Sequence, residues 1–269
     1  MNISNTSVKK TAVFSLKDKY TSGVIAACIY MFLLIVLSTS VGLAGITLSL
    51  IGAYILTLLF LVFLILPLTF GYIYRGTLVV FTGDSEPLLI FKYFTSRKDY
   101  LRAFKMSILL TGNALFVGIL LFIPAIFADL TSSGKLFTLF GAQIPLWTSS
   151  LYPVTYILKT AAVICTVFAM LKYYMAPFLM AANEEMDPVE AIHMSKIISS
   201  RSKWNFIGLA FSFIGYILAC FLIVPMVFIF PYFNAAYNVH CRFAVTMYNK
   251  AVDSMNNPAV PNFNANITF

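Results

Sequence analysis

The chain has 269 residues, of which 60% are hydrophobic and only 10% are charged, and its formal net charge is +8. Soluble globular domains carry roughly 25% charged residues, so this composition excludes that class. The positive charge alone would suit a nucleic-acid binder, but multi-pass membrane proteins also concentrate Lys and Arg in cytoplasmic loops. We therefore expect the lipid bilayer, and no nucleic acid, as a partner. No linker rich in Pro, Gly or Ser divides the chain, which predicts a single integral membrane domain over residues 1–269.

The positions between Lys19 and Arg75 contain no charged residue and no histidine. A span of about 20 apolar residues crosses a bilayer, so this run is long enough for two crossings. Within it, Ile51–Leu66 is apolar on nearly every face, which differs from the alternating pattern of a membrane β-barrel. The basic start followed by an apolar stretch would also fit a signal peptide. Because the apolar run resumes at Ile46, we expect an uncleaved first crossing instead.

The remaining apolar segments predict an all-α fold, a polytopic transmembrane helix bundle with about six crossings. The crossings are expected at about 22–44, 50–74, 106–128, 157–181, 204–226 and 229–249. The division of residues 204–249 rests mainly on Pro225 and Pro231, and one re-entrant pair fits the same residues.

Positive charge is distributed unevenly between the two sides of this arrangement. The N-terminal tail, the loops 75–105 and 182–203 and the C-terminal end share one side and hold nearly all Lys and Arg residues. The opposite loops contain only Lys135 and, at the edge, Lys159. The positive-inside rule then predicts a protein of the plasma membrane with both termini in the cytoplasm.

Two cytoplasmic segments, about 86–105 and 187–201, are expected to be short interfacial helices. If residues 88–105 are helical, apolar side chains such as Tyr93 gather on one face and charged side chains on the other. The basic residues are candidate contacts for anionic lipid headgroups: Lys92, Lys98, Arg102 and Lys105. A loop that packs on the bundle explains the same pattern.

A metal or acid–base site has one candidate, the pair Glu190 and His193 in E-x-x-H spacing. Di-iron bundles need two such motifs, and this one occurs once. A helix start with Asp187 as the N-cap and Pro188 at the first position explains the residues and is favoured over a metal site. No Walker loop, HExxH motif or dinucleotide fingerprint occurs, so we expect no enzyme, no catalytic residue, no metal site and no cofactor. The four cysteines are interpreted as small buried hydrophobic residues.

Polar side chains inside the expected crossings are the remaining candidates, because each costs free energy in hydrocarbon unless it faces protein or water. Asn234, Asn238 and Arg242 recur every four residues and form a polar stripe, while Asn113 and Lys172 lie in the third and fourth crossings. The stripe would either line a substrate path or hydrogen-bond to neighbouring helices, and Lys172 and Arg242 would snorkel to the headgroups.

The stretch 173–249 contains a series of short motifs. They are an acidic turn with Pro188, Glu190-Ala191-Ile192, Ser195-Lys196, Lys203, Phe211-Ser212-Phe213-Ile214-Gly215, and Pro231-Tyr232 followed by Ala235, Ala236 and Tyr237. Through them the chain resembles a family of bacterial six-helix membrane proteins catalogued as domain-of-unknown-function family 975. That family usually has Gly two positions before the Lys matched by Lys203, where this chain has Arg201. The family is similar in plan to the membrane regions of some glycerophosphodiester phosphodiesterases. The resemblance implies a bacterial inner-membrane location and a helix count, and it supplies no activity.

The sequence thus favours a non-enzymatic membrane partner or a lipid- or export-related accessory, whose partners would be other membrane proteins or a second copy of the chain. The alternative is a small transporter, or a transporter half-unit, that uses the polar stripe. A membrane enzyme acting on lipid ranks third.

Overall fold

The computed structural model describes residues 4–47, 50–133, 138, 152–219 and 223–254. Every regular element in these residues is a helix, which confirms the all-α fold class. The chain forms two compact units, and each is described by itself. Unit 1 comprises residues 1–108 and 173–269, and unit 2 comprises residues 109–172.

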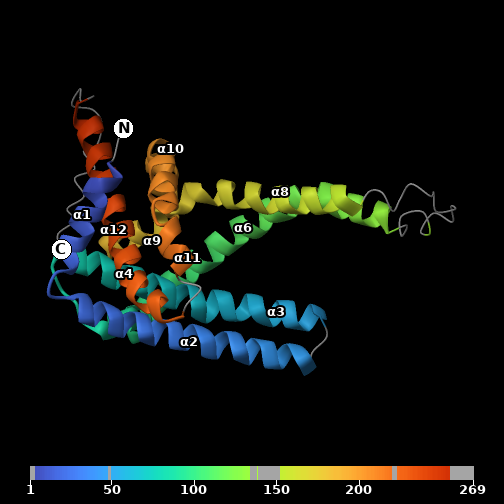
Figure 1. The fold of residues 1–269 in the computed structure, drawn as a ribbon, viewed down its shortest axis with the longest axis horizontal. Helices are drawn as coiled ribbons and strands as arrows, with labels where there is room; N and C mark the ends of the chain where they lie inside the picture. The colour runs from blue at the N-terminus through green and yellow to red at the C-terminus, as the bar shows by residue number, and fades with distance from the viewer. Residues whose placement is uncertain (1–3, 48–49, 134–137, 139–151, 220–222, 255–269) are drawn as a thin grey trace. The chain divides into compact units, whose positions relative to one another are not determined.

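The elements of unit 1 begin at the N-terminus and resume after residue 172 (Figure 1). They are α1 (Asn5–Leu16), α2 (Tyr20–Thr47), α3 (Leu50–Phe60), the π-helical turn η1 (Leu61–Ile65), α4 (Leu66–Phe81), the 3-10 turn η2 (Pro87–Phe91), α5 (Lys92–Thr95), the start of α6 (Arg97–Ser132), α9 (Ala176–Ala182), α10 (Pro188–Phe211), α11 (Ile214–Ala219) and α12 (Ile223–Ser254). Unit 2 holds the rest of α6, α8 (Tyr152–Met170) and most of η4 (Leu171–Tyr173).

Four helical stretches among the described residues are long and apolar enough to cross a membrane. They are Tyr20–Ser40, Ile51–Phe81, Arg97–Ser132 and Tyr152–Ala182. The expected count of six is therefore not reproduced, because neither 204–226 nor 229–249 is among them. In 204–226 no long helix is described: α10 ends at Phe211, α11 has six residues, and residues 220–222 lie outside the described part of the chain. In α12, two asparagines and a histidine interrupt the apolar part.

Burial changes abruptly along the second of these stretches. Residues 51–64 are apolar and largely exposed, and Ile51 and Tyr54 keep 71% and 68% of their surface. From Pro67 to Val79 almost every residue is buried in protein. In α2, similarly, Ala26 and Tyr30 are buried while Phe32 is exposed. Contiguous exposed apolar surface is unusual outside lipid, so these hairpin helices have a lipid-facing part and a protein-packed part.

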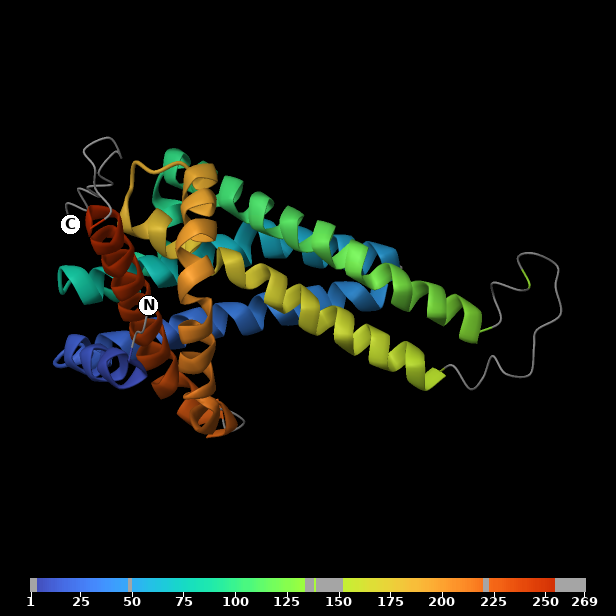
Figure 2. The same cartoon turned by 90° about the horizontal axis from the view of Figure 1, so that it is seen from above.

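The later helices of unit 1 pack on the buried part of this hairpin. In both views α2 and α3 run side by side, whereas α12 crosses them at a steep angle (Figures 1 and 2). Helix α4 lies at the centre and contacts η2, α9 and α12, while α1 packs against α12. Gly71 permits the approach of η2, because the carbonyl of Ile90 occupies the place that a Cβ would take.

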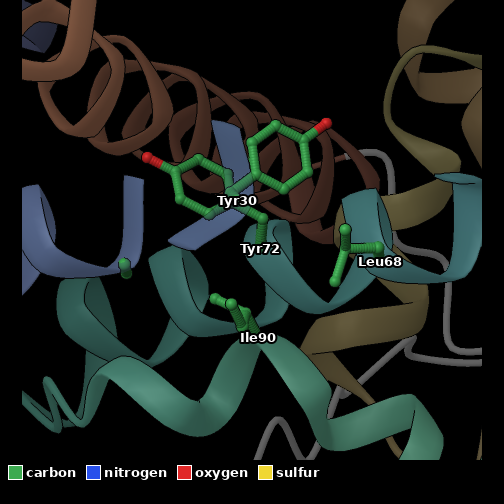
Figure 3. Close-up of a cluster of buried hydrophobic side chains, with 5 residues drawn as sticks. Tyr30, Leu68, Tyr72 and Ile90 are labelled. Atoms are coloured by element: carbon green, nitrogen blue, oxygen red, sulfur yellow. The ribbon is translucent and has the colours of Figure 1, made fainter. Parts of the chain in front are cut away.

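A small aromatic core joins α2, α4 and η2 (Figure 3). Its buried members are Ala26, Tyr30, Leu68, Tyr72 and Ile90. The rings of Tyr30 and Tyr72 stack with their centroids 4.9 Å apart. The contact fixes the first helix to the second at the start of the protein-packed part.

Several element boundaries differ from those expected. The N-terminal tail contains α1, with Val8, Ala12 and Leu16 buried at intervals of four residues. The segment 86–105 is divided at Ser96, whose hydroxyl accepts a hydrogen bond from the Asp99 backbone N–H and so starts α6. Helix α10 is continuous from residue 188 to 211, and α12 runs unbroken past Pro231.

Unit 2 is a hairpin of two long apolar helices. Lys159 of α8 forms an ion pair with Asp129 of α6 at 2.9 Å, and the Thr155 hydroxyl lies 3.5 Å from that of Ser132. Most other large apolar side chains along α6 in this unit, such as Phe116, are exposed. Two residues of the sequence-based interpretation, Lys135 and Cys220, lie outside the described residues.

Candidate functional site: an aromatic pocket in unit 1

The predicted polar stripe of α12 faces α4, and its two asparagines form hydrogen bonds there. The Asn234 amide donates to the Tyr72 carbonyl at 2.9 Å, and the Asn238 amide donates to the Asn234 side-chain oxygen at 2.9 Å. The Thr77 hydroxyl donates to the Asn238 side-chain oxygen at 2.8 Å, and Asn238 is fully buried. Gly76 leaves the space for these amides. The two asparagines therefore join helices, as polar groups do in membrane proteins.

Arg242 continues the same interface at the end of α4. Its guanidinium donates to the Val80 carbonyl at 3.3 Å and lies 4.5 Å from the centre of the Phe81 ring. Residues 72, 77 and 80 of α4 contact residues 234, 238 and 242 of α12, respectively. Because the residue numbers rise together in both helices, α4 and α12 run in the same general direction where they meet.

The other two predicted polar residues belong to unit 2, whereas the stripe belongs to unit 1. The Asn113 amide donates to the Leu109 carbonyl of its own helix at 2.7 Å. Lys172 is exposed in η4. Neither is a member of the stripe.

Beside the stripe, a pocket of about 320 Å³ lies between five segments of unit 1. Aromatic rings form most of its wall: Tyr30, Tyr72, Tyr174, Phe206, Phe230, Phe233 and Tyr237. Thr69, Ile73, Pro177 and Asn234 complete the lining, which contains no charged side chain. Small-molecule sites in proteins occupy roughly 300–1,000 Å³, so this pocket is at the lower end of that range.

Most hydroxyls in the lining already have partners. Tyr30 pairs with the Thr69 hydroxyl at 2.9 Å, and Tyr237 donates to the Tyr174 carbonyl at 2.6 Å. Tyr174 lies 2.9 Å from the Ser202 hydroxyl and 3.1 Å from His240 Nε2.

The Tyr72 hydroxyl is the exception in the lining. Tyr72 is only 4% exposed, and its hydroxyl is buried and makes no hydrogen bond within the described part of the chain. A buried polar group without a partner costs roughly 1–3 kcal/mol, and native structures contain few of them. The Tyr72 oxygen is covered by protein and is not open to the pocket, so its ring rather than its hydroxyl belongs to the pocket wall. The arrangement suits a mainly apolar molecule.

A buried arginine, which sequence reasoning placed at the start of a loop, lies next to this region. Arg75 is only 2% exposed and donates to the Ser22 hydroxyl at 2.9 Å and the Ser85 carbonyl at 3.1 Å. These bonds tie α4 to the first turn of α2 and to the segment before η2. Burial of Arg75 could not be read from the sequence, because a charged residue after a long apolar run ordinarily marks a membrane boundary.

The predicted lipid-contacting residues are largely engaged within the protein. Lys92 forms ion pairs with Glu184 at 3.2 Å and Asp99 at 3.7 Å. Arg102 donates to the carbonyls of Met180 and Met186 at 3.0 Å and also to that of Asn183.

Lys105 and Asp187 form a second link, with an ion pair of 2.7 Å, while Lys98 is exposed. The Tyr74 hydroxyl and Lys92 hold the pKa of Glu184 below its usual value, and Lys105 does the same for the pKa of Asp187. These cations attach α5 and the start of α6 to the turn before α10.

The acidic turn is a helix start, as one of the two interpretations proposed. Asp187 caps α10 by accepting the Val189 backbone N–H at 3.1 Å, and Pro188 is the first helical residue. Glu190 and His193 are exposed. In the described residues no group of three His, Cys, Asp or Glu side chains lies close enough to hold a metal ion.

The interpretation of the cysteines as buried is wrong for two of them. Cys241 is buried, but Cys28 and Cys165 are exposed. Both lie on apolar helices, where a small hydrophobic side chain is equally suited to contact with lipid.

The fold and the pocket define an α-helical membrane protein with a cavity of ligand size among its protein-packed helices. Comparisons with models of protein families, with curated protein sequences and with solved structures give no match.

Proposed function

We propose that this chain is a non-enzymatic protein of the bacterial inner membrane that binds a small, mainly apolar molecule, such as a lipid-derived compound, in the aromatic pocket. The observation that carries the proposal is the pocket of about 320 Å³ with a mainly aromatic, uncharged wall. The aromatic rings would cover the surface of such a ligand. The role is then that of a lipid-related membrane accessory.

The same proposal includes a topology with four crossings and both termini in the cytoplasm. Four described stretches have the required length and composition, and an even number of crossings keeps the termini on one side. Helices α10 and α12, with their Lys and Arg residues, then belong to a cytoplasmic layer rather than to a fifth and sixth crossing. The positive-inside rule supports this arrangement, because the external loops would hold only Lys135 and Lys159.

The hydrogen bonds of the polar stripe argue against the transporter alternative. Asn234 and Asn238 direct their amides to α4 and to each other, so a substrate would have to displace these bonds. Only Asn234 contributes to the pocket wall.

The pocket is tested with two substitutions in its wall. Ile73→Phe adds a ring to the pocket wall, and Tyr72→Phe removes only the unpartnered hydroxyl. The wild-type protein, purified in detergent, is expected to release a small molecule on denaturation that mass spectrometry detects. Ile73→Phe should lose this molecule, whereas Tyr72→Phe should retain it like wild type, because the Tyr72 oxygen is covered by protein and its ring is kept.

Ile119→Phe is the matched control, because Ile119 is exposed on α6 in unit 2 and should leave ligand retention unchanged. A wild-type protein that releases no small molecule, or an Ile73→Phe protein that retains as much as wild type, would refute the proposed binding function.

A further inference from the structure

A second and larger cavity lies at the other side of α12, where α1 meets α11 and the first turn of α2. This groove has a volume of about 740 Å³. Its wall includes apolar side chains of α1 and α12, and three of them are exposed: Val13, Phe14 and Phe228. Phe14 retains 78% of its surface, which is unusual for a phenylalanine on a helix with a buried opposite face.

Two lysines of α1 border this apolar surface. Lys10 and Lys17 both line the groove and are exposed, and they are two helical turns apart with Phe14 between them. The neighbouring Lys9 instead turns to the protein, where its ammonium donates to the Ser212 carbonyl at 2.8 Å and lies 4.6 Å from the centre of the Phe213 ring. Asp18 is the single carboxylate of the wall, so the lining remains net positive.

The basic residues elsewhere on this part of unit 1 differ from these two. Lys92, Arg102 and Lys105 are held by carboxylates or carbonyls of the protein. Lys10 and Lys17 take part in none of the ion pairs found in the described residues. A cationic pair above an apolar floor is complementary to a molecule with an anionic head and an apolar tail.

We propose that the groove binds one anionic phospholipid of the inner leaflet. The phosphate lies between Lys10 and Lys17, and an acyl chain runs over Phe14 and Phe228. A lipid is favoured over a protein helix because the groove reaches Tyr20, the first residue of a candidate crossing, and the apolar side chains of Tyr20 and Ile25 are exposed on this part of α2. The inference uses the proposed cytoplasmic position of α1, but it does not depend on the aromatic pocket.

The test is native mass spectrometry of the full-length protein in detergent, titrated with phosphatidylglycerol. The wild-type protein should bind one molecule with clear preference over phosphatidylcholine. In the double variant Lys10→Gln and Lys17→Gln, the affinity for phosphatidylglycerol should fall roughly 25-fold, whereas the affinity for phosphatidylcholine should not change. Phe14→Ser should weaken the binding of both lipids, because it removes the apolar floor and leaves the charge.

The control is the double variant Arg201→Gln and Lys250→Gln, which removes the same charge at two exposed positions outside the groove. It should bind phosphatidylglycerol like wild type. Equal losses in both double variants, or no loss in the first, would overturn the groove as the site. If Ile73→Phe leaves the affinity for phosphatidylglycerol unchanged, the groove and the aromatic pocket bind their ligands separately. Failure of the groove proposal is then distinct from failure of the pocket proposal.

Discussion

Single residues at the contact between α4 and α12 determine how closely the two helices approach. Asn234 and Asn238 bring their amides to the backbone of α4 at Gly76, the residue with no side chain. Asn238 is fully buried, so each of its polar atoms needs a partner inside the protein, and Thr77 and Asn234 provide them. The close packing of α4 against α12 therefore depends on Gly76 as much as on the two asparagine amides.

Substitution of Gly76 by Ala is expected to destabilise the protein. The new Cβ would meet the amide nitrogens of Asn234 and Asn238, and their displacement would break the hydrogen bonds to α4. Overpacking of this kind costs about 1–3 kcal/mol. Gly118→Ala is the control, because no atom lies within 4 Å of a Cβ there, and alanine favours a helix by about 1 kcal/mol. Thermal unfolding in detergent measures the stability of both variants. A Gly76→Ala protein at least as stable as wild type would contradict the packing described.

At the scale of elements, the features that could be predicted from the sequence are those that depend on long uncharged runs of residues. The all-α fold and the four stretches that are long and apolar enough to cross a membrane follow from length and apolarity, and the helix start at Asp187 follows from its capping signature. Helix α1 was not predicted, because its lysines make the N-terminal tail polar overall. Val8, Ala12 and Leu16 nevertheless have helical spacing. That spacing is the signal that would have revealed it.

The candidate site was less predictable than the helices. The stripe of α12 was recognisable from its four-residue spacing, and one of the two interpretations, hydrogen bonding between helices, agrees with the contacts. The pocket beside it was not recognisable. Its wall comes from five separate segments, and in each of them an aromatic residue such as Tyr72 or Phe206 resembles any other apolar residue of a membrane helix.

The ion pairs that link α5 and the start of α6 to the turn before α10 should weaken in acid. The folded protein lowers the pKa of Glu184 and of Asp187 from their ordinary values of 4.5 and 3.8. The stabilisation is therefore present above these values and is lost as pH falls through the lower pKa values of the folded state. Hydrogen exchange of residues 183–187 should be slow at pH 6 and faster, relative to the intrinsic rate, near pH 3.

The double variant Glu184→Gln and Asp187→Asn provides the control for this prediction. Asparagine still caps a helix, so α10 should persist, and the loss of exposed ion pairs should cost about 1 kcal/mol or less. The acid dependence of exchange should become flatter. An identical acid dependence in wild type and variant would show that other groups are responsible.

For the whole molecule, the open question of sequence reasoning is how residues 204–249 relate to the bilayer. In unit 1 the steep crossing of α12 over α2 and α3 favours a layer packed on the ends of the hairpin (Figures 1 and 2). The alternative with six crossings places the turn at residues 226–229 outside the cell. The two topologies therefore assign opposite sides of the membrane to Phe228.

Cysteine labelling of intact cells distinguishes these topologies. In a background without native cysteines, Phe228→Cys should resist a membrane-impermeant maleimide until the cells are permeabilised. Ser133→Cys at the end of α6 should react at once, and Lys98→Cys should behave like Phe228→Cys, because both topologies agree on these two positions. Reaction of Phe228→Cys in intact cells would exclude the topology with four crossings.

The pairing of α4 with α12 also sets a delay in biogenesis. Thr77 and its partner Asn238 are 161 residues apart. At a synthesis rate of roughly 5–20 residues per second, α4 waits about 8 to 30 seconds for the helix that covers its polar face. During this interval Thr77 and the Tyr72 carbonyl lack their asparagine partners, so the nascent chain presents a polar surface that an insertase or a membrane protease can recognise. The time for which the chain is exposed to quality control therefore follows from where α12 lies in the sequence.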